Sequence, residues 1–193
     1  DVEGFRSYIT RELRENLLDE EDQELLYGNN VGNNLNGLSN QVSGFNQTIP
    51  TTNPQELDVL RAARLQVRNA KIGGQMVCLV SPDKYATIEL LKDQDRRYLN
   101  QINYINGTLY AWGMPVVEHT AVADDDFFVG SFSRGAQIVD RMSATIGFFE
   151  QDRDNVEYNL ITARIEERLV IFSGKPNAIV YGNFTDAIAN YTS

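Results

Sequence analysis

The stretch NLITARIEERLVIFSGKPNAIVYGNF, residues 159–184, decides the fold because it predicts a long strand, a turn and a second strand. Inside the first strand, Glu166, Glu167 and Arg168 interrupt a run of residues that otherwise favours β structure. Two explanations are open at this point. The charges could form a carboxylate pair that performs catalysis, or they could contact a second copy of the same chain.

Alternation along a strand assigns these side chains to two faces. One face would carry Ile161, Ala163, Ile165, Leu169 and Ile171, with Glu167 among them, and the other would carry Thr162, Arg164, Glu166, Arg168 and Val170. The arginines two residues before and after Glu166 keep it ionised, and the simplest interpretation of its face is a solvated or ion-paired surface. Glu167 on the apolar face needs a partner, since an unpaired buried carboxylate is costly, and Arg141 or Arg153 is the expected one.

Catalytic chemistry is weakly supported by the rest of the sequence. Glu166 and Glu167 point to opposite sides of a strand, so they cannot act as an acid/base pair without a bulge, and a hydrolase is the weakest hypothesis. His119 is the only histidine, and no cluster of residues has metal-ligand spacing. No nucleotide-binding, nucleophile-elbow or zinc-protease motif occurs. Cys78 lies in an apolar run, where a buried free thiol is the preferred interpretation over a nucleophile. We therefore expect no enzyme, no metal and no cofactor.

Composition places the chain among ordinary globular proteins. Its 193 residues, 42% of them hydrophobic, allow one core or two small cores that share a sheet. A formal net charge of −10 argues against specific nucleic-acid binding, because such a chain cannot neutralise phosphates. No apolar run is long enough to cross a membrane. The chain opens with DVEGF and not with Met, which suggests a fragment or a processed product.

The order of predicted elements is that of an α+β protein. A helix is expected over residues 1–26, followed by a long Gly- and Asn-rich loop. A second helix is expected over 54–69, capped by Asn53 with Pro54 at its first position. A buried strand over 75–80 leads through Ser81 and Pro82 into a third helix that ends near Leu91. Short strands are expected over 109–112, 115–118, 127–129 and 137–139, and long extended segments begin at Ser143.

Four stretches together carry a resemblance to a known family. They are SYITRELRENLLDEEDQELLYGNNVGNNLNGL (7–38), LVSPDKYATIELLKDQDRRYL (79–99), GMPVVEH (113–119) and the segment from VGSFSRG to IVYGNF (129–184). In that order they resemble the acidic helix with its glycine loop, the proline-led helix, the "PVv" strand and the closing strands of tailed-phage major capsid proteins. The chain is therefore similar to the Hong Kong 97-like capsid family over nearly its whole length.

The resemblance implies the fold and its division into domains. A spine helix and long strands, residues 1–27 and 143–173, would form a peripheral domain, and residues 28–142 and 174–193 an axial α/β domain. The final strand near 178–181 would pack back on the axial sheet. Members of the family carry an N-terminal arm and an extended loop before the spine helix. The chain would then be a truncated core that forms a monomer or a small ring instead of a closed shell.

The implied function is that of a shell protein. Copies would associate into pentamers and hexamers of an icosahedral capsid that encloses double-stranded DNA in the virion, assembled in the host bacterial cytoplasm. Scaffold, portal and decoration proteins are possible further partners, and neither specific nucleic-acid binding nor a membrane is expected. The alternative is an encapsulin-like bacterial nanocompartment shell, which shares the fold but encloses an enzyme.

The same resemblance assigns roles to particular residues. Arg164, Glu166, Glu167 and Arg168 become candidates for pairing across subunit boundaries. Some members of the family crosslink a loop lysine to an asparagine with help from a glutamate, and those positions fall on Asn159 and Glu166. Many relatives keep both residues without crosslinking, so a structural role for the two is the preferred interpretation.

Overall fold

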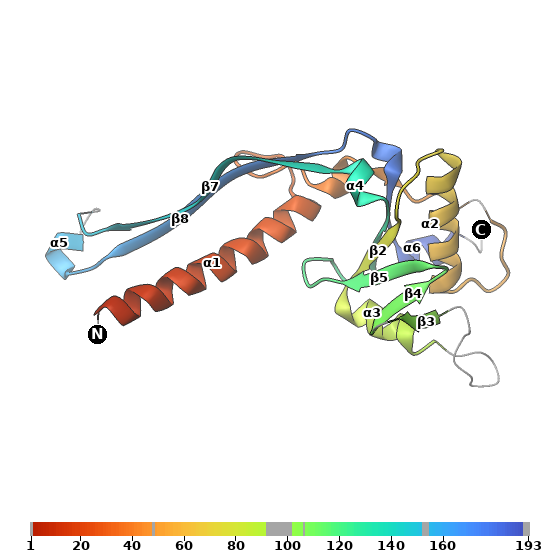
Figure 1. Cartoon of the computed structure of the whole chain (residues 1–193), viewed down its shortest axis with the longest axis horizontal. Coiled ribbons are helices and arrows are strands. Elements are labelled where there is room, and N and C mark those ends of the chain that lie inside the picture. Colours follow the sequence, from red (N-terminus) through yellow and green to blue (C-terminus); the bar gives the residue numbers. More distant parts are fainter. Residues whose placement is uncertain (1, 48, 92–101, 106, 152–154, 191–193) are drawn as a thin grey trace.

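The computed structural model describes residues 2–47, 49–91, 102–105, 107–151 and 155–190. Figure 1 shows two unlike parts: a long helix and a two-stranded ribbon reach away from a body built on a larger sheet. The helices are α1 (Val2–Tyr27), η1 (Leu38–Asn40), α2 (Glu56–Asn69), α3 (Pro82–Glu89), α4 (Phe132–Gly135), α5 (Asn155–Tyr158), η2 (Pro176–Ala178) and α6 (Phe184–Ala189). The strands are β1 (Ser43–Gly44), β2 (Val77–Val80), β3 (Ile102–Ile105), β4 (Thr108–Ala111), β5 (Met114–Glu118), β6 (Asp126–Gly130), β7 (Gln137–Phe149), β8 (Thr162–Phe172) and β9 (Ile179–Asn183).

The body is a seven-stranded mixed sheet in the order β1-β9-β6-β2-β5-β4-β3. The pairs β1–β9 and β2–β5 are parallel, and the other neighbours are antiparallel. Strand β6 lies between β9 and β2 and is buried along its whole length, because a cluster of apolar side chains packs on each of its faces. Phe127 and Val129 join the core cluster that also holds α2 and α6, whereas Phe128 joins a second cluster at the C-terminal end of α1.

The extension, by which we mean α1, β7, α5 and β8, is built differently. Strands β7 and β8 pair antiparallel from Gln137↔Phe172 to Phe149↔Thr162, and α1 runs alongside them in Figure 1. The pairing shifts register twice in β7, once past Arg141 and again opposite Glu167. Such bulges bend and twist a ribbon. Among residues 3–24, 137–151 and 155–170, only Asn155 at the far end is buried, so the extension has no dry core of its own along most of its length.

Most of the elements predicted from sequence are present. Helix α1, strands β2, β4, β5, β6 and β9, and the start of α3 at Ser81 and Pro82 match the expected positions. The Ser81 hydroxyl accepts a hydrogen bond from the Lys84 amide at 3.2 Å, which is the cap that the sequence indicated.

Three local predictions differ from the structure in detail. Helix α2 is not capped by Asn53, because Asn53 has a left-handed φ of 52° and the cap is Gln55, which forms a reciprocal capping box with Asp58. Helix α3 ends at Glu89, two residues before the end predicted near Leu91. The short strand expected over 137–139 is the beginning of one continuous strand, β7, which runs to Phe149. Part of the stretch 79–99 lies outside the described residues.

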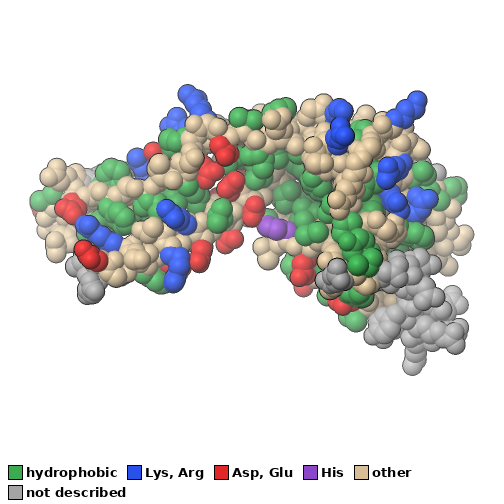
Figure 2. Space-filling model, viewed as in Figure 1, with side chains coloured by type: hydrophobic (Ala, Val, Ile, Leu, Met, Phe, Trp, Pro, Cys, Tyr) green, Lys and Arg blue, Asp and Glu red, His purple; other side chains and the backbone are tan. Residues whose placement is uncertain are grey.

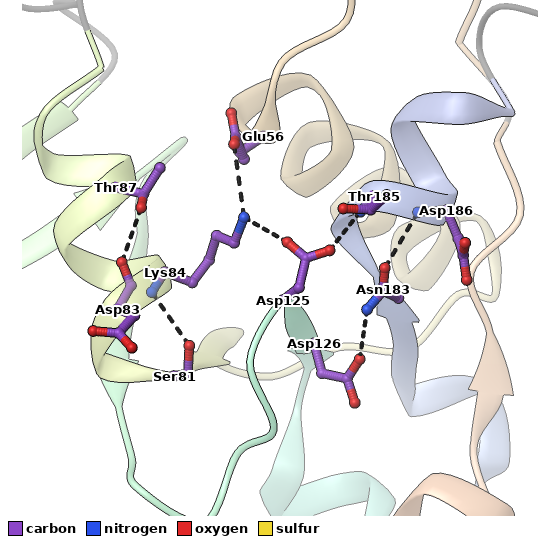
Figure 3. A network of polar contacts seen from close by, with 10 residues as sticks. All are labelled: Glu56, Ser81, Asp83, Lys84, Thr87, Asp125, Asp126, Asn183, Thr185 and Asp186. Carbon is purple, nitrogen blue, oxygen red and sulfur yellow. Dashed lines mark hydrogen bonds and ion pairs between the residues drawn. The ribbon is translucent and has the colours of Figure 1, made fainter.

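A polar network closes the body beside α6 (Figure 3). The Lys84 ammonium on α3 lies 2.5 Å from an Asp125 carboxylate oxygen and 3.8 Å from a Glu56 oxygen on α2. Asp125 in turn accepts a hydrogen bond from the Thr185 amide at 2.8 Å, at the start of α6. The ammonium and these donated hydrogen bonds lower the pKa of Asp125 against the opposing effect of burial. The network therefore fixes α2, α3 and α6 to the turn that precedes β6.

Candidate functional site

The charged face of β8 lies on the surface of the extension as the sequence indicated. Arg164 and Arg168 are exposed, and the Arg164 guanidinium lies 3.4 Å from a Glu166 carboxylate oxygen. The same guanidinium stands over the Phe149 ring, 5.0 Å from its centre. Exposed ion pairs of this kind contribute about 0–1 kcal/mol to stability. Exposed and less exposed side chains alternate from Glu167 to Phe172, as the assignment to two faces predicted, but Thr162 and Glu166 are only partly exposed. The Arg164–Glu166 pair explains little of the fold's stability.

The expected arginine partner of Glu167 is not found. Arg141 forms no ion pair with Glu167 in the part of the chain that the structure describes, and Arg153 lies outside the described residues. The bulges of β7 are the physical reason, because they place Arg141 outside the regular pairing that would bring it toward Glu167. Glu167 is partly buried and faces the acidic half of α1 instead.

Glu167 lies in an acidic groove between α1 and β8. The groove has a volume of about 670 Å³, and four of its lining side chains on α1 and β8 are Glu20, Glu21, Glu24 and Glu166. Burial, followed by the charges of Glu167, Asp22 and Asp140, raises the pKa of Glu21 above its ordinary value. Figure 2 shows acidic side chains gathered where the extension meets the body. The sequence analysis missed this groove, although the run Asp19–Asp22 was visible as its signal.

Asn159 adopts a left-handed backbone conformation at the end of α5. It directly follows α5 and has a left-handed φ of 52°, a conformation that asparagine tolerates better than most residues. The Leu160 amide then donates to the Asn155 carbonyl at 2.9 Å, which ends the helical turn. Asn159 is exposed and stands seven residues before Glu166 in the chain. Its backbone geometry alone gives a structural reason for asparagine at this position.

The base of α1 is fastened to the body by side chains. The Tyr27 hydroxyl donates to an Asp126 carboxylate oxygen and accepts from the Ala123 amide, both at 3.1 Å. One turn earlier, Asp22 lies 3.3 Å from the Nε2 atom of His119, whose Nδ1 atom accepts from the Ala121 amide. These contacts set the direction in which the extension leaves the body.

Other candidate chemistry is sparse in the described part of the chain. No group of three or more His, Cys, Asp or Glu side chains there is arranged to hold a metal ion. Cys78 is fully buried, and that burial raises the pKa of its thiol, which keeps it protonated and unreactive. Among the described residues, no helix combines the length and apolar character needed to cross a membrane. The main features of the described structure are therefore surfaces on the extension: a long ribbon, a partly covered helix and an acidic groove.

Comparison with known proteins accounts for this architecture. A family model described as the phage capsid family matches residues 1–184. The chain belongs to the phage capsid family. It is 33% identical over 185 residues to the major capsid protein of Enterobacteria phage HK97, an alignment that covers 96% of the chain and 48% of that protein. The chain thus spans about half the length of the curated relative that it matches.

Solved structures show the same capsid fold. The capsid of an empty GTA particle matches with a TM-score of 0.71 at 14% identity, over 93% of this chain and 66% of that one. An encapsulin, in the holo-SrpI complex from Synechococcus elongatus PCC 7942, matches with a TM-score of 0.61 at 13% identity, over 90% and 63%. These likenesses show the fold, and the α+β Hong Kong 97-like prediction is confirmed.

Proposed function

We propose that the chain is the shell-forming part of a tailed-phage major capsid protein. Copies associate into pentamers and hexamers, which close into an icosahedral container for double-stranded DNA in the virion. The family match over residues 1–184 carries this proposal, and the elongated helix and ribbon beside a compact body fit it. Large shells of this kind hold together through many modest interfaces, because each contact alone is too weak to trap a misplaced subunit.

Two domains follow from this proposal. Residues 1–27 and 143–173 form the peripheral domain, and residues 28–142 and 174–193 form the axial domain around the capsomer centre. The separate two-stranded and seven-stranded sheets support such a division. Strand β7 passes through residue 143 without a break, so the boundary is a position along one strand and not a linker.

The charged face of β8 serves the contacts between subunits. Arg164, Glu166 and Arg168 are exposed or partly buried, and Arg168 has no ion pair in the described part of the chain. Charge complementarity at such a contact fixes register more than strength. The net charge of −10 suits a wall along which packaged DNA slides without binding. Assembly in the host cytoplasm with scaffold, portal and decoration proteins belongs to the same proposal.

The test is assembly of the protein expressed from its complete reading frame. Negative-stain electron microscopy and light scattering should show closed particles of uniform diameter built from capsomers. Reversing Arg164 to Glu should reduce the yield of particles, and a second reversal, Glu166→Arg, should recover part of it. A protein that stays monomeric at high concentration and in every ionic condition would overturn the proposal.

An encapsulin-like shell is the second candidate, because an encapsulin is among the matching structures. The two candidates differ in what the shell holds. Particles purified from the native source and treated with nuclease should retain protected double-stranded DNA if the shell is a phage capsid. A single co-purifying enzyme with no protected DNA would favour the encapsulin.

We expect shells of this chain to lack covalent crosslinks between Asn159 and a lysine. Asn159 is explained by its left-handed backbone, and Glu166 by its ion pair with Arg164. Assembled particles boiled in detergent should therefore run as single chains in electrophoresis. A ladder of multimers that disappears in Glu166→Gln would show that the crosslinking interpretation is the right one.

A further inference from the structure

The extension of this molecule is incomplete as a folded unit. Apart from Asn155, no described side chain among residues 3–24, 137–151 and 155–170 is buried, whereas β6 in the body is buried along its whole length. A two-stranded ribbon is marginally stable in water unless something packs against it, and a single helix covers only part of one face. The extension therefore needs further contacts to become rigid.

The uncovered surface of α1 has the composition of a contact surface. Phe5, Tyr8 and Leu18 remain 65%, 50% and 57% exposed. Phe5 and Tyr8 lie about one turn apart and can form one apolar contact, whereas Leu18 lies ten residues further along the helix. The Arg11 guanidinium stands over the Tyr8 ring, 5.6 Å from its centre, and all three side chains still keep at least half of their surface exposed.

The charges of α1 are divided along its length. All three of its arginines, Arg6, Arg11 and Arg14, lie in its N-terminal half, where Glu3 and Glu12 accompany them, and its C-terminal half carries the acidic run from Asp19 to Glu24 without a basic residue. Arg6 pairs with Glu150 at 3.0 Å, and the exposed Arg11 lies 3.7 Å from Glu12 and 3.9 Å from Glu15 on its own helix. Arg14 has no ion pair among the described residues. Figure 2 shows a group of acidic side chains beside the body, and basic side chains mixed with a few acidic ones farther out on the extension.

This division is unfavourable within one molecule. The C-terminal end of a helix carries partial negative charge from its dipole and is stabilised by cations, yet the last turn of α1 has no basic residue. Glu167 on β8 adds another carboxylate to the same groove. Within the described chain, His119 contacts Asp22, and Arg168 lines the groove without forming an ion pair there, so two cationic groups face this run of carboxylates. Cationic side chains from outside the molecule would relieve the repulsion.

We propose that Arg11 and Arg14 of one copy enter the acidic groove of a neighbouring copy, and that this contact also covers the apolar face of α1. The occupant is a second copy because one helix carries both the exposed arginines and the acidic run that they would contact. The proposal rests on the self-association proposed above and names the surface that performs it. It has a consequence for dynamics: the extension becomes ordered only when copies associate, while the body is ordered in the free subunit.

The test exchanges the charges of the two halves in the full-length protein. The variants are R11E/R14E, E20R/E21R and the combination of all four substitutions, with association measured by analytical ultracentrifugation. Each double reversal should weaken association about tenfold or more, because attraction becomes repulsion at one side of the contact. The combination should return to within about threefold of the native affinity.

Controls separate this proposal from simpler explanations. Glu118 and Asp124 are exposed on the body, and E118R/D124R changes the net charge by as much as E20R/E21R without touching α1. This control should associate like the native protein. Hydrogen exchange provides a readout that does not depend on variants: amides of α1, β7 and β8 should exchange at least about tenfold faster in dissociated subunits than in assembled ones, while β6 stays protected in both.

Several results would overturn the proposal. They are native association in either double reversal, no recovery in the combination, equal loss in the E118R/D124R control, or full protection of α1 in dissociated subunits. If the native protein forms particles and the reversals have no effect, only this contact is refuted. If the native protein does not associate at all, the proposed shell function fails with it.

Discussion

The substitution Tyr27→Phe tests how the extension is fastened to the body. It removes one hydroxyl, which donates to Asp126 and accepts from the Ala123 amide, both at 3.1 Å. The ring itself stays, and with it the edge contacts to Phe128 and Tyr181, whose ring centres lie 5.9 and 6.2 Å away. The change therefore isolates the polar contribution of this anchor.

The expected cost is about 1–2 kcal/mol of unfolding free energy. A hydrogen bond to a charged group contributes about 1.5–3 kcal/mol, but two features reduce the loss here. Asp126 keeps the Tyr181 hydroxyl at 2.8 Å and the Asn183 amide at 3.0 Å, and the Ala123 amide is exposed enough for water to replace the lost acceptor. Tyr27→Ala, which also removes the ring, should cost about 3–5 kcal/mol.

Urea unfolding followed by circular dichroism measures the effect. With an m value of about 2 kcal/mol per molar, Tyr27→Phe should lower the midpoint by roughly 0.5–1 M without changing the slope. Tyr8→Phe is the matched control, because Tyr8 lies on the same helix and is 50% exposed, and its hydroxyl makes no hydrogen bond among the described residues. Equal stability of Tyr27→Phe and the native protein, or an equal loss in Tyr8→Phe, would refute the anchoring role.

Two further predictions concern the body. Gly130→Ala should destabilise the fold by about 3 kcal/mol or more, because the added Cβ atom would meet the Ala178 carbonyl and lie 2.6 Å from the Ile179 Cα atom. Gly44→Ala is the control and should be neutral, because an added Cβ atom there meets open space. Equal unfolding midpoints for the two variants would contradict this prediction. Burial and the contacts with Asp126 raise the pKa of Tyr181 to about 12, above the value of about 10 in the unfolded chain. The stability that the protonated Tyr181 hydroxyl contributes is therefore complete below pH 10 and is lost as the pH rises toward 12. Unfolding curves across that range should show a decline in the free energy of unfolding that is shallower in Tyr181→Phe. An equal decline in the variant would assign the loss of stability to other groups.

Regular periodicity made much of this fold predictable from sequence. The alternation in β8 placed Arg164, Arg168 and Val170 on one face, and the structure leaves all three more exposed than their direct neighbours in the strand. Glu166 departs from this pattern, because it is partly buried and lines the same groove as Glu167. Ser81 and Pro82 marked the start of α3 correctly, since a serine cap followed by proline satisfies the first turn locally. Where neighbouring residues alone determine the local backbone geometry, that geometry can be predicted from the sequence.

The errors arose where distant parts of the chain decide the outcome. Asn53 and Pro54 look like a helix start, but Asn53 adopts a turn conformation and Gln55 performs the capping with Asp58. Strand β1 is only two residues in a Gly- and Asn-rich loop, and it exists because β9 pairs with it from more than 130 residues away. The surroundings of Glu167 depend on two bulges in β7, which no alternation pattern reveals.

The place of β9 within the sheet has a consequence for how the protein is made. This strand comes near the end of the described chain, yet it is inserted between β1 and β6. During synthesis on the ribosome, the hydrophobic edge of β6 therefore stays unpaired until residues 179–183 have been synthesised. A nascent or prematurely terminated polypeptide exposes that edge as a template for aggregation, and only a finished subunit is competent to join others.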